Sequence, residues 1–417
     1  MLPLNSQVIF LLLAMGISAS VYGYVGWRTI GPARLRSSRK RALWGLLAVF
    51  WVLPPLPLVF RPLGNASALV DELSWVAFLS LGFFVLAFCL LVAADLARLA
   101  LALVRSLLRN TAQSLATDRS TAHDPDDAGA AMVMGRRGFL GHAANLGLLG
   151  TSGALVGYGL DEAMQMPAVV HIRLHVPHLP PALEGFRIAQ LTDLHLGPML
   201  KGPFMGRVVE RTNALEPDLI ALTGDLVDGT VPHLRDAVQP LASLAAREGT
   251  CFVTGNHEYY SGVEPWVEHL DGIGVHVLQN AHRLVRRGSA RLLVAGVNDP
   301  TGARFMGAQP PDLSAAMAGA GDTDFKLLLA HQPLAIYDAA REGFDLQLSG
   351  HTHGGQFFPW NLVVGLFQPY VRGLHLHAGT WIYVSKGTGF WGPPMRLGTH
   401  SEITLIELTG RAETRVA

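Results

Sequence analysis

Long apolar runs dominate the first part of the chain. Four of them, at residues 8–27, 43–60, 73–94 and 139–160, contain no Asp, Glu, Lys or Arg. Each has about the length that crosses the hydrocarbon core of a bilayer. The pattern predicts a membrane region at 1–109 with three transmembrane segments, a polar linker at 110–135, and a fourth transmembrane segment at 136–162. The second run is the weakest of the four, because Pro54, Pro55 and Pro57 would suit a broken or re-entrant segment.

The charges that flank these runs predict an orientation. Basic residues gather at 28–41 and within 98–137, and the positive-inside rule assigns such loops to the cytoplasm. Four crossings then put the N-terminus and everything after residue 161 outside. The segment around Arg136 and Arg137 resembles a twin-arginine export signal, although an ordinary basic stop before a membrane helix explains it equally well. No small-x-small cleavage site follows, so we expect a retained anchor in the cytoplasmic (inner) membrane.

From 170 to 417 the pattern changes to short apolar runs that end in Asp, Asn or His. The runs begin at residues 186, 219, 251, 325 and 344 and read as buried strands. The first three sites are about one strand–helix–strand unit apart. Open α/β sheets place their sites at the carboxyl ends of strands, so we expect one shared site. The side chains at the run ends are Asp193, His195, Asp225, Asn256, His257, His331, His351 and His353.

Composition removes several classes of protein. Only 15% of the residues are charged, against about 25% in an ordinary soluble domain. Lys+Arg and Asp+Glu both number 32, so there is no overall basic field and no nucleic-acid binding is expected. Two cysteines, Cys89 and Cys251, form neither a disulfide framework nor a thiolate metal cluster. The chain is therefore expected to join a membrane region to an α/β domain without thiolate sites.

The run ends, taken in order, resemble a known family. The blocks look like the five signature motifs of calcineurin-like metallophosphoesterases, and the similarity covers about 185 to 410. The continuation Gly354-Gly355-Gln356 is similar to the membrane-associated branch of that superfamily. The resemblance implies a four-layer αββα sandwich. The blocks are Asp193-x-His195, Gly224-Asp225, Gly255-Asn256-His257-Glu258, His331 and Gly350-His351-x-His353.

The same resemblance implies a centre of two divalent metal ions. It assigns Asp193, His195 and His353 to one ion, Asn256, His331 and His351 to the other, and Asp225 to both. Carboxylate, amide and imidazole donors without thiolates suit Mn, Fe, Zn or Co. Two such ions can lower the pKa of a water molecule and neutralise phosphoryl oxygens. His257 is not a ligand by this resemblance, and would donate a hydrogen bond to the developing charge or protonate the leaving group.

Three further features have weaker support. Asp228 would orient a metal ligand, or is an exposed turn carboxylate. Arg396 would bind a substrate phosphate, or forms a structural ion pair. The apolar run 357–367 is either ordinary core or a membrane-facing lip that receives an acyl or prenyl chain.

These features predict a membrane-anchored dimetal phosphoesterase that acts on lipid-linked or cell-envelope phosphates. One alternative is a catalytically silent metal-binding membrane sensor or scaffold. A transporter is disfavoured, because the apolar segments offer little beyond Asp95 to line a pathway. One similar subgroup hydrolyses a UDP-2,3-diacylglucosamine-type pyrophosphate. That substrate is made in the cytoplasm, which conflicts with the expected outside location of the domain.

Overall fold

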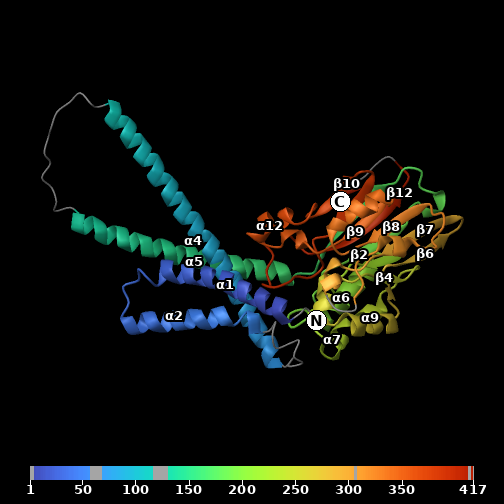
Figure 1. Cartoon of the computed structure of the whole chain (residues 1–417), viewed down its shortest axis with the longest axis horizontal. Coiled ribbons are helices and arrows are strands. Elements are labelled where there is room, and N and C mark those ends of the chain that lie inside the picture. Colours follow the sequence, from blue (N-terminus) through green and yellow to red (C-terminus); the bar gives the residue numbers. More distant parts are fainter. Residues whose placement is uncertain (1–3, 57–67, 116–129, 305–307, 412–414, 417) are drawn as a thin grey trace.

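The protein consists of a helical region followed by an α/β domain (Figure 1). This computed structural model describes residues 4–56, 68–115, 130–304, 308–411 and 415–416. The long helices of the first part are α1 (Leu4–Thr29), α2 (Ser37–Val52), α4 (Ala68–Leu115) and α5 (Ala130–Met164).

Two stretches of these helices, Leu69–Arg109 and Phe139–Met164, are long and apolar enough to cross a membrane. Helices α1, α2 and α4 pack through a cluster that includes Tyr22, Leu47 and Leu91. Asp95 of α4 accepts hydrogen bonds from Arg28 of α1 and from Arg98 of its own helix, and the first of these ties α1 to α4. The number of spans and their direction stay predictions.

Two boundaries differ from those expected. Helix α4 continues to Leu115 and α5 begins at Ala130, so both ends of the predicted linker 110–135 are helical. Residues 110–115 contain neither Gly nor Pro, and 130–134 are Ala, Met and Val, so nothing local stops either helix. Helix α2 ends at Val52, two residues before Pro54, because proline disrupts a helix. The middle of the linker and the end of the second apolar run lie outside the described residues.

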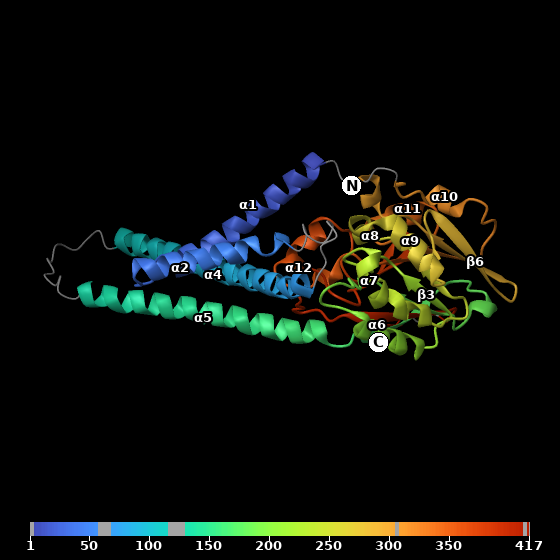
Figure 2. The same ribbon diagram turned by 90° about the horizontal axis from the view of Figure 1, so that it is seen from below.

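Two sheets build the α/β domain (Figure 2). In the first sheet, β2, β3, β4 and β5 are parallel neighbours, and β12 pairs with β2 antiparallel and with β1 parallel. Its order is β13 (Arg415–Val416), β1 (Ala168–His175), β12 (Glu402–Thr409), β2 (Arg187–Leu191), β3 (Leu219–Leu222), β4 (Thr250–Phe252), β5 (His276–Val277). The second sheet runs β10 (Gly373–His377), β11 (Thr380–Val384), β9 (Leu346–Ser349), β8 (Phe325–Leu329), β7 (Ala290–Gly296), β6 (Ala281–Arg287).

Three apolar layers hold the domain together. The facing sides of the sheets enclose the central one, which includes Ile188 and Leu219 from the first sheet and Leu327 from the second. Helices α6 (Gly202–Asn213), α7 (Val231–Val238) and α9 (Val263–Gly272) cover the first sheet, and α10 (Leu313–Met317) and α11 (Ile336–Arg341) cover the second. The predicted four-layer αββα sandwich is therefore confirmed.

The strands that carry the run-end residues divide between the two sheets. Strands β2, β3 and β4 belong to the first sheet, and β8 and β9 to the second. The sequence pattern alone pointed to the edge of one open sheet. Because each sheet buries one face on the other, their carboxyl edges meet, and the loops after all five strands converge there.

Candidate metal centre

The first group of donors consists of Asp193 and His195 after β2 and His353 after β9. Their ligand atoms lie within 4.8 Å of one another. His195 Nε2 is 3.0 Å from His353 Nε2, and His353 Nε2 is 3.4 Å from Asp193 Oδ1. All three residues are buried. The structure thus brings together the three side chains expected at one metal.

The second group joins Asp225 after β3 to His331 after β8 and His351 after β9. Here His331 Nε2 is 3.1 Å from Asp225 Oδ2, and His351 Nδ1 is 3.2 Å from His331 Nε2. Asp225 Oδ2 also lies 3.8 Å from His195 Nε2 of the first group, so this carboxylate stands between the groups. Asn256 begins the short helix α8 (Asn256–Ser261), and its Oδ1 is buried without a hydrogen-bond partner.

Unusual backbone conformations bring the donors inward. Asp193, Asp225 and His351 have φ of 51°, 53° and 70°, in the left-handed region that non-glycine residues rarely adopt. Such strain persists where the surroundings fix it and is common at functional sites. Gly350 allows the loop after β9 to approach Asp193 closely, because a side chain at this position would collide with the Asp193 carboxylate. The loops therefore keep unfavourable backbone conformations that direct the donor side chains to the centre.

Hydrogen bonds at the outer ring nitrogens prepare the imidazoles to bind metal. His195 Nδ1 donates to Asp228, and His331 Nδ1 donates to the Thr223 carbonyl at 2.8 Å. These acceptors hold the protons at Nδ1 and leave Nε2 to face the centre. Two facing Nε2 atoms at 3.0 Å, as in His195 and His353, repel unless a cation or proton lies between them. The donor set therefore fits two divalent cations.

Burial and neighbouring charges shift the pKa values of the donor side chains. Burial alone would raise the pKa of Asp225, but the nearby imidazoles of His331 and His257 hold it well below its usual range. Burial and the charge of His331 lower the pKa of His351 to about 3. Burial would lower the pKa of His331, but the carboxylates of Asp225 and Asp193 raise it well above its usual range, so a metal ion bound here would have to displace the proton of this imidazole.

His257 and Asp228 form a pair beside the donors. The His257 ring donates from Nδ1 to Asp228 Oδ1 at 2.6 Å, and the same oxygen accepts from His195 at 3.1 Å. His257 Nε2 lies 4.0 Å from Asp225 Oδ2. Asp228 thus orients both a donor and the neighbouring imidazole. Their predicted roles, as ligand orienter and as proton donor, are compatible with this position.

Glu258 has a position that the sequence pattern did not reveal. It is fully buried, and its carboxylate accepts hydrogen bonds from the backbone N–H groups of Asp225, Leu226 and Gly255. It therefore joins the loop after β3 to the loop after β4. The available signal was a glutamate at the third position of a helix that follows a turn, where it can reach back to the free N–H groups.

Arg396 lies away from the open side of the centre. It is fully buried, and Nη2 donates to the carbonyls of Lys386 at 2.8 Å and Gly389 at 2.5 Å. Gly387 separates the guanidinium from the metal-ligand side chains, since a Cβ there would lie 3.1 Å from Asp193 Cβ and 3.2 Å from Arg396 Nη2. This position favours a structural role over contact with a substrate phosphate.

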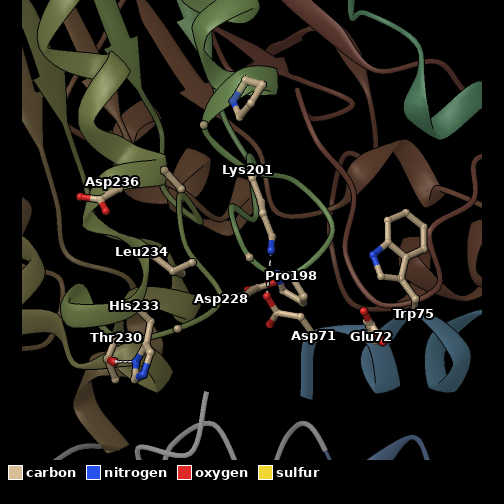
Figure 3. Close-up of a pocket in the computed structure, with 15 residues that line it drawn as sticks. Asp71, Glu72, Trp75, Pro198, Lys201, Asp228, Thr230, His233, Leu234 and Asp236 are labelled. Carbon is tan, nitrogen blue, oxygen red and sulfur yellow. Dashed lines mark hydrogen bonds and ion pairs between the residues drawn. The ribbon is translucent and has the colours of Figure 1, made fainter. Parts of the chain in front are cut away.

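A pocket of about 620 Å³ opens on the far side of Asp228 (Figure 3). Its walls come from the start of α4, with Asp71 and Trp75, and from the loop that precedes α6, with Lys201. Lys201 Nζ reaches Asp71 Oδ2 at 2.9 Å across it. Asp228 is a wall residue that also contacts His195 of the first donor group. The pocket therefore adjoins the centre through Asp228 and does not contain it.

Comparisons with known proteins find a family model and relatives that are similar to this chain. The family model for calcineurin-like phosphoesterase matches residues 186–355. A Danio rerio "transmembrane protein with metallophosphoesterase domain" is 40% identical over 260 residues, which is 60% of this chain and 59% of that protein. An "uncharacterized metallophosphoesterase" of Helicobacter pylori is 38% identical over 61% of this chain and 68% of its own length. A 5'-nucleotidase precursor structure from Thermus thermophilus aligns with a TM-score of 0.34 at 17% identity, over 53% of this chain and 54% of that one.

Proposed function

Because the chain belongs to the calcineurin-like phosphoesterase family, we propose that it is a membrane-anchored enzyme that hydrolyses phosphoester or pyrophosphate bonds with two divalent metal ions. The curated relatives from Danio rerio and Bos taurus are covered over 59% of their length, so the activity of the whole protein is part of this proposal. Lipid-linked or cell-envelope phosphates are the substrates that we propose.

The shared position of Asp225 is the observation that carries the proposal. Asp193, His195 and His353 would hold one ion, and Asn256, His331 and His351 the other, with Asp225 between them. When bound, divalent cations supply charge that offsets phosphoryl oxygens and lowers the pKa of water; Mn, Fe, Zn and Co all suit these donors. His257 is held by Asp228 at the edge of this centre, where an imidazole can donate a proton to the leaving oxygen.

Two apolar helices support attachment to a membrane. Asp71, at the start of α4, contacts the α/β domain through Lys201, whereas Asp95 of the same helix pairs with Arg28 next to the basic loop 28–41. The 24 residues between them correspond to about 36 Å of helix, which is close to the thickness of a bilayer core. The basic loop and the α/β domain lie at opposite ends of the 71–95 stretch of α4, which favours an extracytoplasmic domain on an inner-membrane protein.

Hydrolysis of an aryl phosphodiester by the full-length, Mn2+-loaded protein tests the activity. Asp225→Asn should lower the bound metal below two ions and the rate by roughly three orders of magnitude, as expected for a residue that acts with others as a unit. The exposed Asp236 provides the matched control, Asp236→Asn, which should keep both. His257→Ala should retain metal and lose turnover.

The alternative of a silent sensor predicts a different result. Wild-type protein that binds two metals and cleaves no phosphoester would favour the sensor and reject the enzyme. The natural substrate can be sought by incubating metal-loaded protein with extracted envelope lipids and nucleotides and identifying the products by mass. Hydrolysis of UDP-2,3-diacylglucosamine in that mixture to UMP and 2,3-diacylglucosamine 1-phosphate would instead support the cytoplasmic substrate and contradict the orientation.

A further inference from the structure

An apolar surface lies next to the metal centre on the segment after His353. Five large side chains between residues 358 and 367 are 42% to 79% exposed, and the short helix α12 (Trp360–Val363) has no buried residue. Val364 is the buried exception in this run. The exposed side chains show that most of the predicted lip faces outward instead of forming core. The five side chains, called here the α12 patch, are Phe358, Trp360, Leu362, Leu366 and Phe367.

Helix α12, which carries part of the patch, lies near the helical region. Figures 1 and 2 both show α12 on the side of the α/β domain that is turned toward α4 and α5. A contiguous exposed apolar surface in this position is expected to meet either lipid or protein. The position of the patch along the two apolar helices decides whether lipid or protein covers it.

Hydrogen bonds and close contacts fix that position. Gln356, just before the patch, accepts from the Leu397 N–H at 2.9 Å and donates from Nε2 to the Trp391 carbonyl at the same distance. The segment 393–397 in turn contacts both helices: a Cβ at Gly82 of α4 would lie 3.1 Å from Met395 Sδ, and one at Gly159 of α5 would lie 2.9 Å from Met395 Cβ. Gly82 lies inside the apolar run of α4 and Gly159 at the end of that of α5. Segment 393–397 therefore spans the depth from the middle of the α4 run to the end of the α5 run next to the α/β domain, and it ties the patch to the leaflet on that side.

We propose that the α12 patch inserts into the outer leaflet of the bilayer beside α4 and α5, so that the metal centre takes a phosphate-bearing lipid directly from that leaflet. The insertion stands on geometry alone, whereas the lipid substrate rests on the proposed phosphoesterase function. Aromatic and leucine side chains are the residues expected at a membrane interface.

Trp391 connects the patch to the centre. Its ring is 48% exposed and lies 5.4 Å from the His257 ring, and Gln356 holds its backbone on both sides, with Oε1 accepting from the Trp391 N–H at 3.1 Å. A lipid whose chains remain in the leaflet beside α12 would thus bring its phosphate past Trp391 to His257. The substrate class is an amphiphile with its phosphoester at headgroup depth.

Lipid quenching tests insertion without reference to activity. Full-length Leu366→Cys, labelled with bimane and placed in phosphatidylcholine–phosphatidylglycerol nanodiscs, should lose at least about half of its fluorescence to nitroxide-labelled lipid. Ser289→Cys is the matched control, because it lies exposed in the turn between β6 and β7, and Figures 1 and 2 show β6 on the side of the domain away from the long helices. Labelled wild type reports any signal from Cys89; Cys251 is fully buried. Equal quenching at the two sites would overturn insertion.

Kinetics test the source of the substrate. Leu362→Glu/Leu366→Glu should slow cleavage of a bilayer-embedded phosphoester lipid roughly tenfold or more, because each charged side chain opposes burial in lipid, and leave cleavage of the soluble aryl phosphodiester unchanged. Leu376→Glu, at an exposed leucine of β10 outside the patch, should change neither rate. An equal loss on both substrates, or no loss on the lipid, would overturn direct uptake. A wild type that is inactive on both would reject the proposed function, while the quenching result would still decide insertion.

Discussion

The backbone N–H of Arg396 donates a hydrogen bond to the carbonyl of Gly159 at 2.9 Å. Gly159 belongs to the apolar helix α5, and Arg396 belongs to the segment that packs behind the metal-ligand loops. The Arg396 side chain binds the carbonyls of Lys386 and Gly389, and the Gly389 N–H donates to the carbonyl of Asp193 at 2.9 Å. A short chain of hydrogen bonds therefore runs from a membrane-type helix to Asp193, one of the proposed metal ligands.

Enlarging Gly159 should disturb this connection. In Gly159→Leu the new side chain would meet Met395 and Leu397, and overpacking of this kind costs about 1–3 kcal/mol. We expect a lower melting temperature and a lower rate of aryl phosphodiester hydrolysis. Gly157→Leu is the matched control on the same helix, because nothing lies within 4 Å of its Cβ position. Equal effects of the two substitutions would show that the contact is unimportant.

Removing the charge of Asp228 should weaken the orientation of two imidazoles at once. Asp228→Asn keeps the shape, but its amide is a poorer acceptor for the His195 and His257 rings. Partners of metal-ligating histidines typically contribute 10- to 100-fold to metal affinity or activity, and we expect a loss of about that size. Titration with Mn2+ and initial rates measure it. Asp236→Asn again serves as the control, and wild-type affinity and rate in Asp228→Asn would contradict the role.

Glu258 should matter for stability as well as activity. Its carboxylate accepts three backbone hydrogen bonds, and Glu258→Gln offers only one oxygen for them. Leaving buried N–H groups without an acceptor costs about 1–3 kcal/mol. Chemical denaturation should therefore show a lower free energy of unfolding than for Glu268→Gln, which changes an exposed glutamate of α9. Unchanged stability would mean that these bonds are replaced.

The metal-free protein should lose stability as the pH rises. Burial alone would lower the pKa of His257, but the carboxylates of Asp225 and Asp228 outweigh it and raise the pKa to about 9. The folded state therefore favours the protonated ring. That stabilisation is complete below the unfolded pKa near 6.5 and disappears as the pH rises through about 9, with a size on the order of 3 kcal/mol.

Thermal unfolding in a chelator between pH 6 and 10 measures this effect. The melting temperature of wild type should fall over that interval, and His257→Gln should flatten the fall. His233→Gln, at an exposed histidine of α7, is the control and should keep the wild-type slope. A wild-type slope in His257→Gln would assign the pH dependence to other groups.

Much of the donor set could be predicted because its signals are local. Asp193, His195, Asp225, His331, His351 and His353 each follow a short apolar run, and a strand followed by a polar turn is decided by neighbouring residues. Glu258 and the position of Arg396 could not be predicted in the same way. Their partners, Asp225 and Gly159, are 33 and 237 residues away, and no local pattern specifies such contacts.

The sequence by itself determined the division into apolar helices and an α/β domain, the strand ends and the chemical type of the site, because these depend on periodicity and residue type. The family resemblance had already implied that Asp225 serves both metals. The tertiary structure decided that the donors come from two sheets instead of one, and that the run 357–367 is exposed beside the membrane-type helices. These relationships depend on how the two sheets pack and where segment 393–397 meets α4 and α5. Packing brings residues that are distant in the sequence together. The pattern of hydrophobic positions determines which faces are buried, but it does not determine which faces pack against each other.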